Sequence, residues 1–272
     1  MIIFKSINKL NKEVNFKATI GFVPTMGSLH KGHISLIKSS QRKCKKTLVS
    51  IFVNPSQFNK RQDLLKYPRN LKKDIAILKK LKVDYLLIPN IKDVYKKKTD
   101  TKIKLYKKDK VMCAFFRPGH FEGVLAVINQ FLKKLDVSYI FFGEKDYQQL
   151  FLISKFIKNK FNVKVVKCKT IRDLNKVALS SRNILLNKMN LKKASNISKL
   201  LINFKKKAKN INQIEIEIRN LKKKINLIKD IKLEYLEVRN MSNLSKLYNL
   251  KNLKIFIAYY IKNIRLIDNF WY

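Results

Sequence analysis

Glycine, proline and histidine are scarce in this chain. Its 272 residues include only six Gly, five Pro and three His. Residues 21–33, GFVPTMGSLHKGH, hold three of the glycines, one proline and two of the histidines, whereas residues 144–272 contain none of the three types. Residues that permit unusual backbone geometry or titrate near neutrality are thus concentrated in the first half. We expect the functional site to include residues 21–33.

Cysteine and long apolar runs are also lacking. The three cysteines, Cys44, Cys113 and Cys168, are odd in number and form no CxxC pair. This pattern argues against a disulfide framework or a zinc site and favours free thiols in a reducing compartment. The longest apolar runs, such as residues 256–261, fall short of the roughly 20 residues that a membrane span needs. The N-terminus does not resemble a signal peptide, so we expect a cytoplasmic protein with no membrane partner.

Acidic residues are few: 18 Asp and Glu face 61 Lys and Arg, which gives a formal net charge of +43. One interpretation is a nucleic-acid-binding surface. The other is a compositional bias, because Lys, Ile and Asn have AT-rich codons while the scarce Gly, Pro and Ala do not. Only nine of the basic residues are Arg, the better phosphate-binding residue, and Lys is scattered over the polar positions. We therefore favour compositional bias, with no specific nucleic-acid partner, and expect low, salt-sensitive stability.

Hydrophobic periodicity predicts two domains. In residues 1–169, apolar strands alternate with amphipathic helices, which is typical of a doubly wound parallel α/β sheet of the Rossmann-like kind. Residues 170–272 begin with a polar loop and continue with helices and then strands, which predicts a smaller α+β domain. The predicted strands span 18–25, 47–54, 83–90, 138–144, 163–170, 232–240, 254–261 and 264–270. The main predicted helices span 33–43, 68–81, 122–135, 148–160 and 211–228.

Gly27, His30, Gly32 and His33 lie between the first predicted strand and the helix after it. Ligands of open α/β sheets bind at the carboxyl ends of strands, and a helix N-terminus attracts phosphate. Two imidazoles three residues apart share one face of a helical turn and can donate hydrogen bonds to phosphate oxygens. The alternative is a structural role, with His33 capping the helix. The spacing matches neither GxGxxG nor the P-loop.

The segment HKGH resembles the HxGH signature of the nucleotidyltransferase superfamily. A longer set of motifs is more specific and resembles the pantoate–β-alanine ligase family in order and spacing, over about the whole chain. These motifs are VPTMGSLHKGH, SIFVNPSQF, YPRNLKKD, RPGHFEGV, FFGEKDYQQL, ALSSRN and RLIDN.

The resemblance implies ATP-dependent ligation of (R)-pantoate and β-alanine to pantothenate through a pantoyl adenylate, with release of AMP and pyrophosphate. It also implies ATP and Mg²⁺ as requirements and a homodimer; the residues that would hold the metal stay unassigned. His33 is the implied proton donor, with His30 beside it on the phosphates. The implied ATP-binding residues are Met26, Gly27, Ser28, Leu29, His30, Lys31, Gly32, His33, Gly143, Glu144, Lys145, Asp146, Ile171, Leu179, Ser180, Ser181 and Arg182.

Further roles follow from the same resemblance. Gln57 is implied to contact both pantoate and β-alanine, and Gln149 to contact pantoate. In the GEKD motif, Gly143 would admit the nucleoside, Lys145 would neutralise phosphate, and Asp146 would accept from the ribose hydroxyls. The SSR residues would hold the β- and γ-phosphates, and Ile171 would contact adenine. Arg117 and His120 are expected to line the same cleft.

Two pairs depart from the family pattern. Asn175-Lys176 replaces an Asp-Gly pair before the SSR residues, which is expected to stiffen or reshape that loop, and Cys113-Ala114 replaces a Glu-Gly pair. Neither change removes a residue assigned to chemistry. Two rival functions stay open from sequence: a different HxGH nucleotidyltransferase, and a basic nucleic-acid-binding protein that has lost the activity.

Overall fold

The computed structural model describes residues 1–272 except 60, 98–101, 159, 205–209 and 247–249. The chain divides into two compact units, Met1–Lys169 and Thr170–Tyr272.

The first unit contains a six-stranded sheet in the order β1-β4-β3-β2-β5-β6, and every pairing is parallel. This arrangement confirms the predicted α/β fold. Its central strands β2 and β3 are buried along nearly their whole length, because helices cover both faces of a parallel sheet. The strands are β1 (Ile2–Phe4), β2 (Ile20–Thr25), β3 (Lys46–Ile51), β4 (Tyr85–Leu87), β5 (Tyr139–Gly143) and β6 (Lys164–Cys168).

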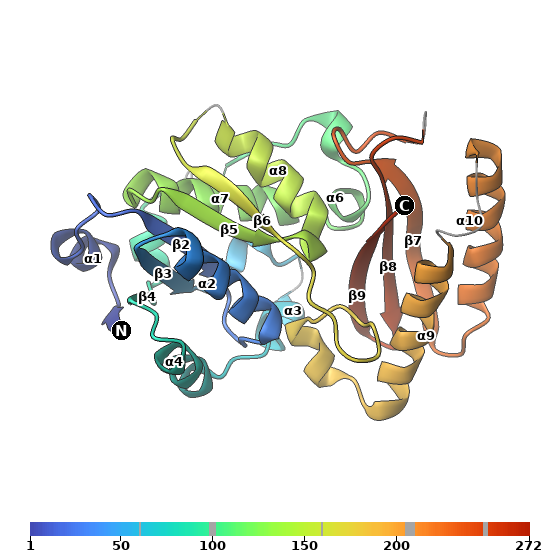
Figure 1. Ribbon diagram of the computed structural model, residues 1–272, viewed down its shortest axis with the longest axis horizontal. Coiled ribbons are helices and arrows are strands. Elements are labelled where there is room, and N and C mark those ends of the chain that lie inside the picture. The colour runs from blue at the N-terminus through green and yellow to red at the C-terminus, as the bar shows by residue number, and fades with distance from the viewer. Residues whose placement is uncertain (60, 98–101, 159, 205–209, 247–249) are drawn as a thin grey trace. The chain divides into compact units, whose positions relative to one another are not determined.

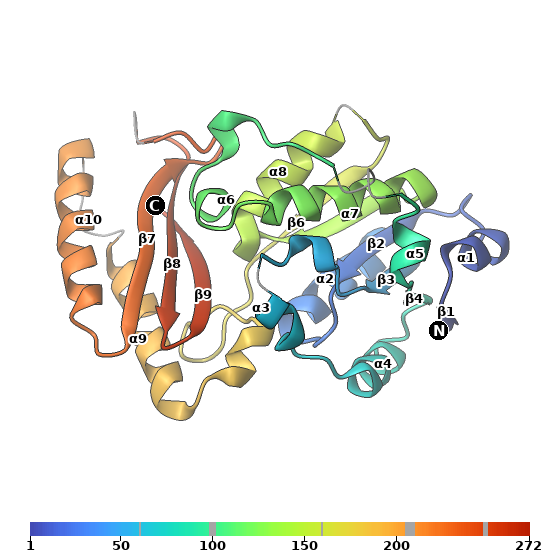
Figure 2. The ribbon, with the colours of Figure 1, turned by 180° about the vertical axis from the view of Figure 1, so that it is seen from behind.

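The strand order reverses between β2 and β5, so their carboxyl ends form the switch point where such sheets bind ligands. Helix α2 (Lys31–Lys43) covers the face of the sheet that is turned toward the viewer in Figure 1. Helix α7 (His120–Lys134) covers the opposite face, which is turned toward the viewer in Figure 2. The other helical segments are α1 (Ile7–Glu13), η1 (Pro55–Gln57), α3 (Arg61–Leu65), α4 (Leu71–Lys80), α5 (Ile91–Val94), η3 (Lys107–Asp109), α6 (Cys113–Phe116), η4 (Glu144–Asp146) and α8 (Tyr147–Lys158).

Three local predictions need correction. Strand β1 and helix α1 were not predicted, because β1 has only three residues, two of them exposed. Helix α2 begins at Lys31, so Gly32 and His33 lie inside its first turn rather than before it. Helix α4 begins at Leu71, because the Asn70 side chain accepts the Lys73 N–H at 3.0 Å and caps it, which leaves Pro68 outside the helix.

The second unit is a three-stranded antiparallel sheet in the order β7-β8-β9, with two long helices packed on it. Its core includes apolar side chains of all three strands and of both helices, among them Leu236, Ile257, Leu266, Ala194 and Ile214. This unit therefore has the predicted α+β character. Its elements are η5 (Ser181–Leu185), α9 (Lys188–Phe204), α10 (Ile211–Asn226), β7 (Ile231–Asn240), β8 (Leu253–Ile261) and β9 (Ile264–Trp271).

The loop that leads to the SSR residues is held by the RLIDN motif. Arg172 donates from both terminal nitrogens to the Asp268 carboxylate, at 2.6 and 2.8 Å, and its guanidinium stacks 4.0 Å from the Phe270 ring centroid. Within the loop, Leu179 N–H donates to the Ile171 carbonyl at 3.0 Å. A bidentate Arg–carboxylate pair fixes orientation as well as position. RLIDN thus anchors the start of the loop that contains Lys176.

Lys176, at the position where the resemblance leads us to expect glycine, adopts a left-handed backbone with φ of 67°. This conformation costs a residue with a Cβ about 1–2 kcal/mol, while glycine's extra unfolded-state entropy offsets about 0.5–1 kcal/mol of it. Lys176→Gly is therefore expected to stabilise the protein by about 0.5–1 kcal/mol and to raise Tm by roughly 1–4 °C. Thermal melts followed by circular dichroism measure this shift. Lys176→Ala is the matched control and should leave Tm unchanged; an equal gain with Ala would disprove the strain explanation.

Ala114, at the second departure, lies inside α6 and is not among the residues with positive φ, so its backbone does not require glycine.

Candidate active site

The two histidines of HKGH cap helix α2 reciprocally. His30 is the N-cap, and its Nδ1 accepts the Gly32 N–H at 3.1 Å, while His33 Nδ1 accepts the His30 N–H at 3.3 Å. The two ring centroids lie 4.1 Å apart. The structural and functional interpretations of these histidines are thus compatible, because capping is what positions the rings.

These hydrogen bonds also assign the tautomers. A ring nitrogen that accepts from a backbone N–H carries no proton, so in each neutral ring the proton is on Nε2. Both imidazoles therefore have an Nε2–H donor at the start of a helix, where backbone N–H groups and the helix dipole already favour an anion. This arrangement suits the binding of phosphate oxygens.

Gly32 is required by the same cap. A Cβ at this position would lie 2.7 Å from Cε1 and 2.9 Å from Nδ1 of His30, closer than non-bonded atoms approach. The glycine lets the His30 ring fold back over its own helix. The fixed G of the HxGH pattern thus has a steric reason.

Burial and nearby positive charge keep both rings neutral. Burial, together with the charge of Lys145, lowers the pKa of His30 to about 4. Burial, His30 and Lys145 lower the pKa of His33 to about 3. In the ligand-free protein at pH 7, the two residues are therefore hydrogen-bond donors rather than cations.

These shifts predict how stability depends on pH. The unfolded chain takes up protons on these histidines below their ordinary pKa of about 6.5, whereas the folded protein does so only near pH 4 and below. Their contribution is complete above pH 6.5 and is lost as the pH falls toward 4. We expect Tm at constant ionic strength to be lower at pH 5 than at pH 7.5. His30→Gln/His33→Gln should show a smaller fall between the two pH values; an identical fall would contradict the assignment.

Gln57, on η1, is 8% exposed and its amide is oriented by Asn54. Asn54 Nδ2 donates to Gln57 Oε1 at 3.1 Å, and Gln57 Nε2 approaches the Met26 sulfur at 3.1 Å. Asn54 itself is held by Tyr95, whose hydroxyl donates to its Oδ1 at 2.9 Å. Thioether sulfur is a weak acceptor. The Gln57 N–H₂ is therefore well placed to exchange that contact for an oxygen of a substrate.

The RPGH motif positions the backbone at Gln57. Arg117 Nη1 lies 2.9 Å from His120 Nε2, and His120 Nδ1 lies 2.7 Å from the Gln57 carbonyl oxygen. Arginine only donates, so Nε2 accepts and the Nδ1–H donates to that carbonyl. On the other side, a Cβ on Gly123 would overlap the Ser56 carbonyl oxygen. Arg117 and His120 thus act on Gln57 through its main chain.

The GEKD motif follows β5, the strand next to β2. Its Lys145 Nζ lies 3.3 Å from Asp146 Oδ1, and its charge acts on both His30 and His33. Nothing lies within 4 Å of a Cβ built on Gly143, so a ligand can approach the backbone there. Gln149 is half-buried in the first turn of α8, directly after this motif.

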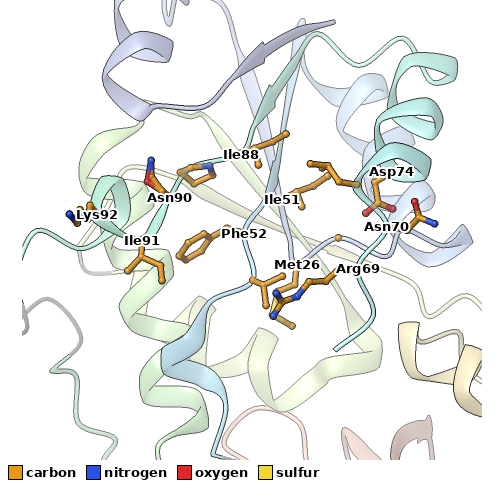
Figure 3. A pocket seen from close by; sticks show the side chains of 14 residues that line it. Met26, Ile51, Phe52, Arg69, Asn70, Asp74, Ile88, Asn90, Ile91 and Lys92 are labelled. Carbon is orange, nitrogen blue, oxygen red and sulfur yellow. The ribbon is translucent and has the colours of Figure 1, made fainter. Parts of the chain in front are cut away.

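A cavity of about 580 Å³ lies beside the MGSLH turn (Figure 3). Met26 and Gly27 line it after β2, Ile51 and Phe52 follow from the end of β3, and Asp74 projects into its wall from α4. The cavity leaves one side of the turn without packed protein atoms.

The remaining predicted ATP residues belong to the second unit. Ser180 caps η5, because its Oγ accepts the Arg182 N–H at 3.3 Å, and Ser181 is buried. Asn183, which follows, donates to the Ala178 carbonyl at 3.1 Å. The assignment of Ile171 and residues 179–182 to the ATP site stays a prediction.

Sequence reasoning gave no role to several residues that shape the site. Asn54, Gly123 and Asp74 lie inside the motifs NPSQF, RPGHFEG and YPRNLKKD. Asn54 contacts Gln57 within its own motif, but the contacts of Asn54 with Tyr95, of Gly123 with Ser56 and of Asp74 with Ser28 join residues distant in sequence. Only Asp74 could have been noticed from sequence, because carboxylates are rare in a chain with so many lysines.

The family model of pantoate–β-alanine ligase matches residues 2–271. The chain belongs to this family. It is 39% identical over 257 residues to the pantothenate synthetase of Flavobacterium psychrophilum, covering 92% of this chain and 91% of that one. The enzyme of Helicobacter acinonychis is 36% identical over 100% of both chains.

Solved structures of the family agree with the fold. Pantothenate synthetase from Thermus thermophilus superposes with a TM-score of 0.91 at 30% identity and 99% coverage of both chains. The Francisella tularensis ligase, crystallised with Beta-gamma ATP and β-alanine, superposes with a TM-score of 0.83 at 36% identity, covering 100% of this chain and 97% of that one. Family membership therefore favours a pantoate–β-alanine ligase over a different HxGH nucleotidyltransferase.

Proposed function

We propose that this chain joins (R)-pantoate to β-alanine in two steps at the carboxyl edge of the first unit's sheet. A pantoate carboxylate oxygen attacks the α-phosphorus of ATP, and the bond to the bridging oxygen of pyrophosphate breaks. The amine of β-alanine then attacks the acyl carbon of pantoyl adenylate, and AMP leaves with the electrons of the C–O bond. The product is pantothenate.

The observation that carries the proposal is the paired Nε2–H donors of His30 and His33 close to Lys145. Negative charge grows on the phosphate oxygens during attack, and preoriented donors stabilise it. The charge of bound ATP raises the pKa of a nearby imidazole, so His33 can also act as the proton donor. Gly143 leaves room for the nucleoside, and Asp146 accepts from its ribose hydroxyls.

The residues proposed to hold pantoate are uncharged. Gln57 donates from Nε2 to a pantoate oxygen in place of the Met26 sulfur, and Gln149 supplies a second amide. Amides bind a carboxylate and hydroxyls without neutralising the nucleophile. Gln57 also contacts β-alanine. In the second unit, Ser180, Ser181 and Arg182 hold the β- and γ-phosphates, Leu179 lies beside them, and the Ile171 backbone contacts adenine.

Mg²⁺ is proposed to enter with ATP. The described residues contain no group of three or more His, Cys, Asp or Glu side chains that could hold a metal ion. This fits a cation that keeps several waters and is held mainly by substrate phosphates. A homodimer and a cytoplasmic location remain proposals that rest on family membership. Among the described residues, no helix is long and apolar enough to span a membrane.

The test is pyrophosphate release from ATP and Mg²⁺, with and without pantoate, before β-alanine is added. Release that requires pantoate, followed by AMP and amide formation on adding β-alanine, is the expected result. EDTA should abolish release and excess Mg²⁺ should restore it. Folded protein that releases no pyrophosphate with pantoate would overturn the proposal.

A further inference from the structure

The turn before helix α2 has an unusual backbone. Gly27 and Ser28 are consecutive left-handed residues, with φ of 79° and 52°. Glycine tolerates this region, but Ser28 has a Cβ and does not favour it. The neighbouring backbone N–H groups of Ser28 and Leu29 point at one place, and successive N–H groups arranged in this way in a turn bind anions, as in phosphate-binding loops. Something must hold this turn in place.

A carboxylate from another helix occupies that point. Asp74 Oδ2 accepts the Ser28 N–H at 2.8 Å, and Asp74 Oδ1 accepts the Leu29 N–H at 2.8 Å. The Asp74 side chain is 2% exposed and lies in the first turn of α4, where the helix dipole favours its charge. Its partners lie 46 and 45 residues away in sequence.

The neighbouring cavity makes these two hydrogen bonds more important. Met26, Gly27 and Asp74 all line it, so the turn lacks packed atoms on that side (Figure 3). Contacts that packing would otherwise supply are absent there. The position of His30, which follows directly and caps α2, therefore depends strongly on the Asp74 carboxylate.

We propose that Asp74 is a positioning residue for the adenylation step, and this rests on the proposed function. It fills the anion-binding turn with the protein's own carboxylate. ATP phosphates are thereby kept off the Ser28 and Leu29 amides and meet the helix start and the two Nε2–H donors instead. The residue acts through the turn and touches no reacting atom.

Measuring the rates of the two half-reactions separately distinguishes this positioning role from a general loss of structure. Asp74→Asn keeps the shape but can accept from only one of the two amides, because its other terminal group is a donor. It is expected to slow pantoate-dependent pyrophosphate release about ten- to a hundredfold, as a small misplacement of catalytic donors does. Amide formation from chemically prepared pantoyl adenylate and β-alanine should stay within about twofold of the unmodified enzyme, because the attack at the α-phosphorus, which the preoriented donors assist, is already complete in that substrate.

Asp84→Asn is the matched control. Asp84 Oδ2 accepts the Thr47 N–H at 2.9 Å, at the opposite end of strand β3. Its variant loses a comparable carboxylate–amide bond, and should change the two half-reactions equally or not at all. If Asp74→Asn does not fold, Asp74→Glu keeps the charge but displaces it by one methylene, and the same asymmetry is expected.

Equal loss of both half-reactions in folded Asp74 variants would show a merely structural role and overturn the inference. Unchanged adenylation would overturn it too. Failure of the proposed function is distinguishable, because the unmodified enzyme would then release no pyrophosphate with pantoate.

Discussion

Replacing His33 with Ala is expected to slow pantoate-dependent pyrophosphate release about 10²- to 10³-fold, the usual cost of removing one preoriented donor from a developing oxyanion. The substitution removes the Nε2–H and also the Nδ1 acceptor that holds the His30 N–H at 3.3 Å. Both effects lower the rate of adenylation. Initial rates at saturating ATP and pantoate measure the change in kcat.

Two variants make this result specific. His33→Gln places an amide N–H₂ near the original Nε2 and should retain more activity than His33→Ala. Lys38→Ala removes an exposed side chain from the same helix and should change nothing. If His33→Ala and His33→Gln lost activity equally, the donor role of Nε2 would be wrong, and capping alone would explain the residue.

Replacing Gly123 with Ala is expected to be the most damaging single-methyl change near Gln57. The added Cβ would overlap the Ser56 carbonyl oxygen and lie 2.8 Å from the Gln57 backbone nitrogen. Because both contacts are with backbone, η1 or α7 must shift. Overpacking of this kind costs about 1–3 kcal/mol of stability. A shift of about 1 Å at Gln57 should lower kcat/KM for pantoate about 10²-fold.

Pantoate-dependent kinetics at fixed saturating ATP, together with a denaturant titration, measure both effects. Asn129→Ala, a half-buried position on the same helix, is the control and should stay close to the unmodified enzyme. A Gly123→Ala enzyme with unchanged kcat/KM for pantoate would show that the contact between α7 and η1 does not position Gln57.

Much of the fold could be predicted because it depends on local patterns. Continuous apolar runs such as residues 47–54 predicted buried parallel strands, and the i, i+3, i+4 spacing from Ile211 predicted α10. The errors arose where the local pattern was weak. Strand β1 is short and mostly exposed. The start of α4 was misplaced because the prediction put Pro68 in the first turn, whereas Asn70 caps the helix and Leu71 begins it.

By itself, the sequence determined the reaction family, because seven motifs occur in the family's order and spacing, and five of them contain the scarce Gly, Pro or His residues. Only the tertiary structure decided how those segments cooperate. The hydrogen bonds from Ser28 to Asp74 and from His120 to Gln57 join residues 46 and 63 positions apart. The neutral state of His30 and His33 likewise follows from burial and from Lys145 on another strand's end. Such contacts depend on which segments meet in space, which no local pattern specifies.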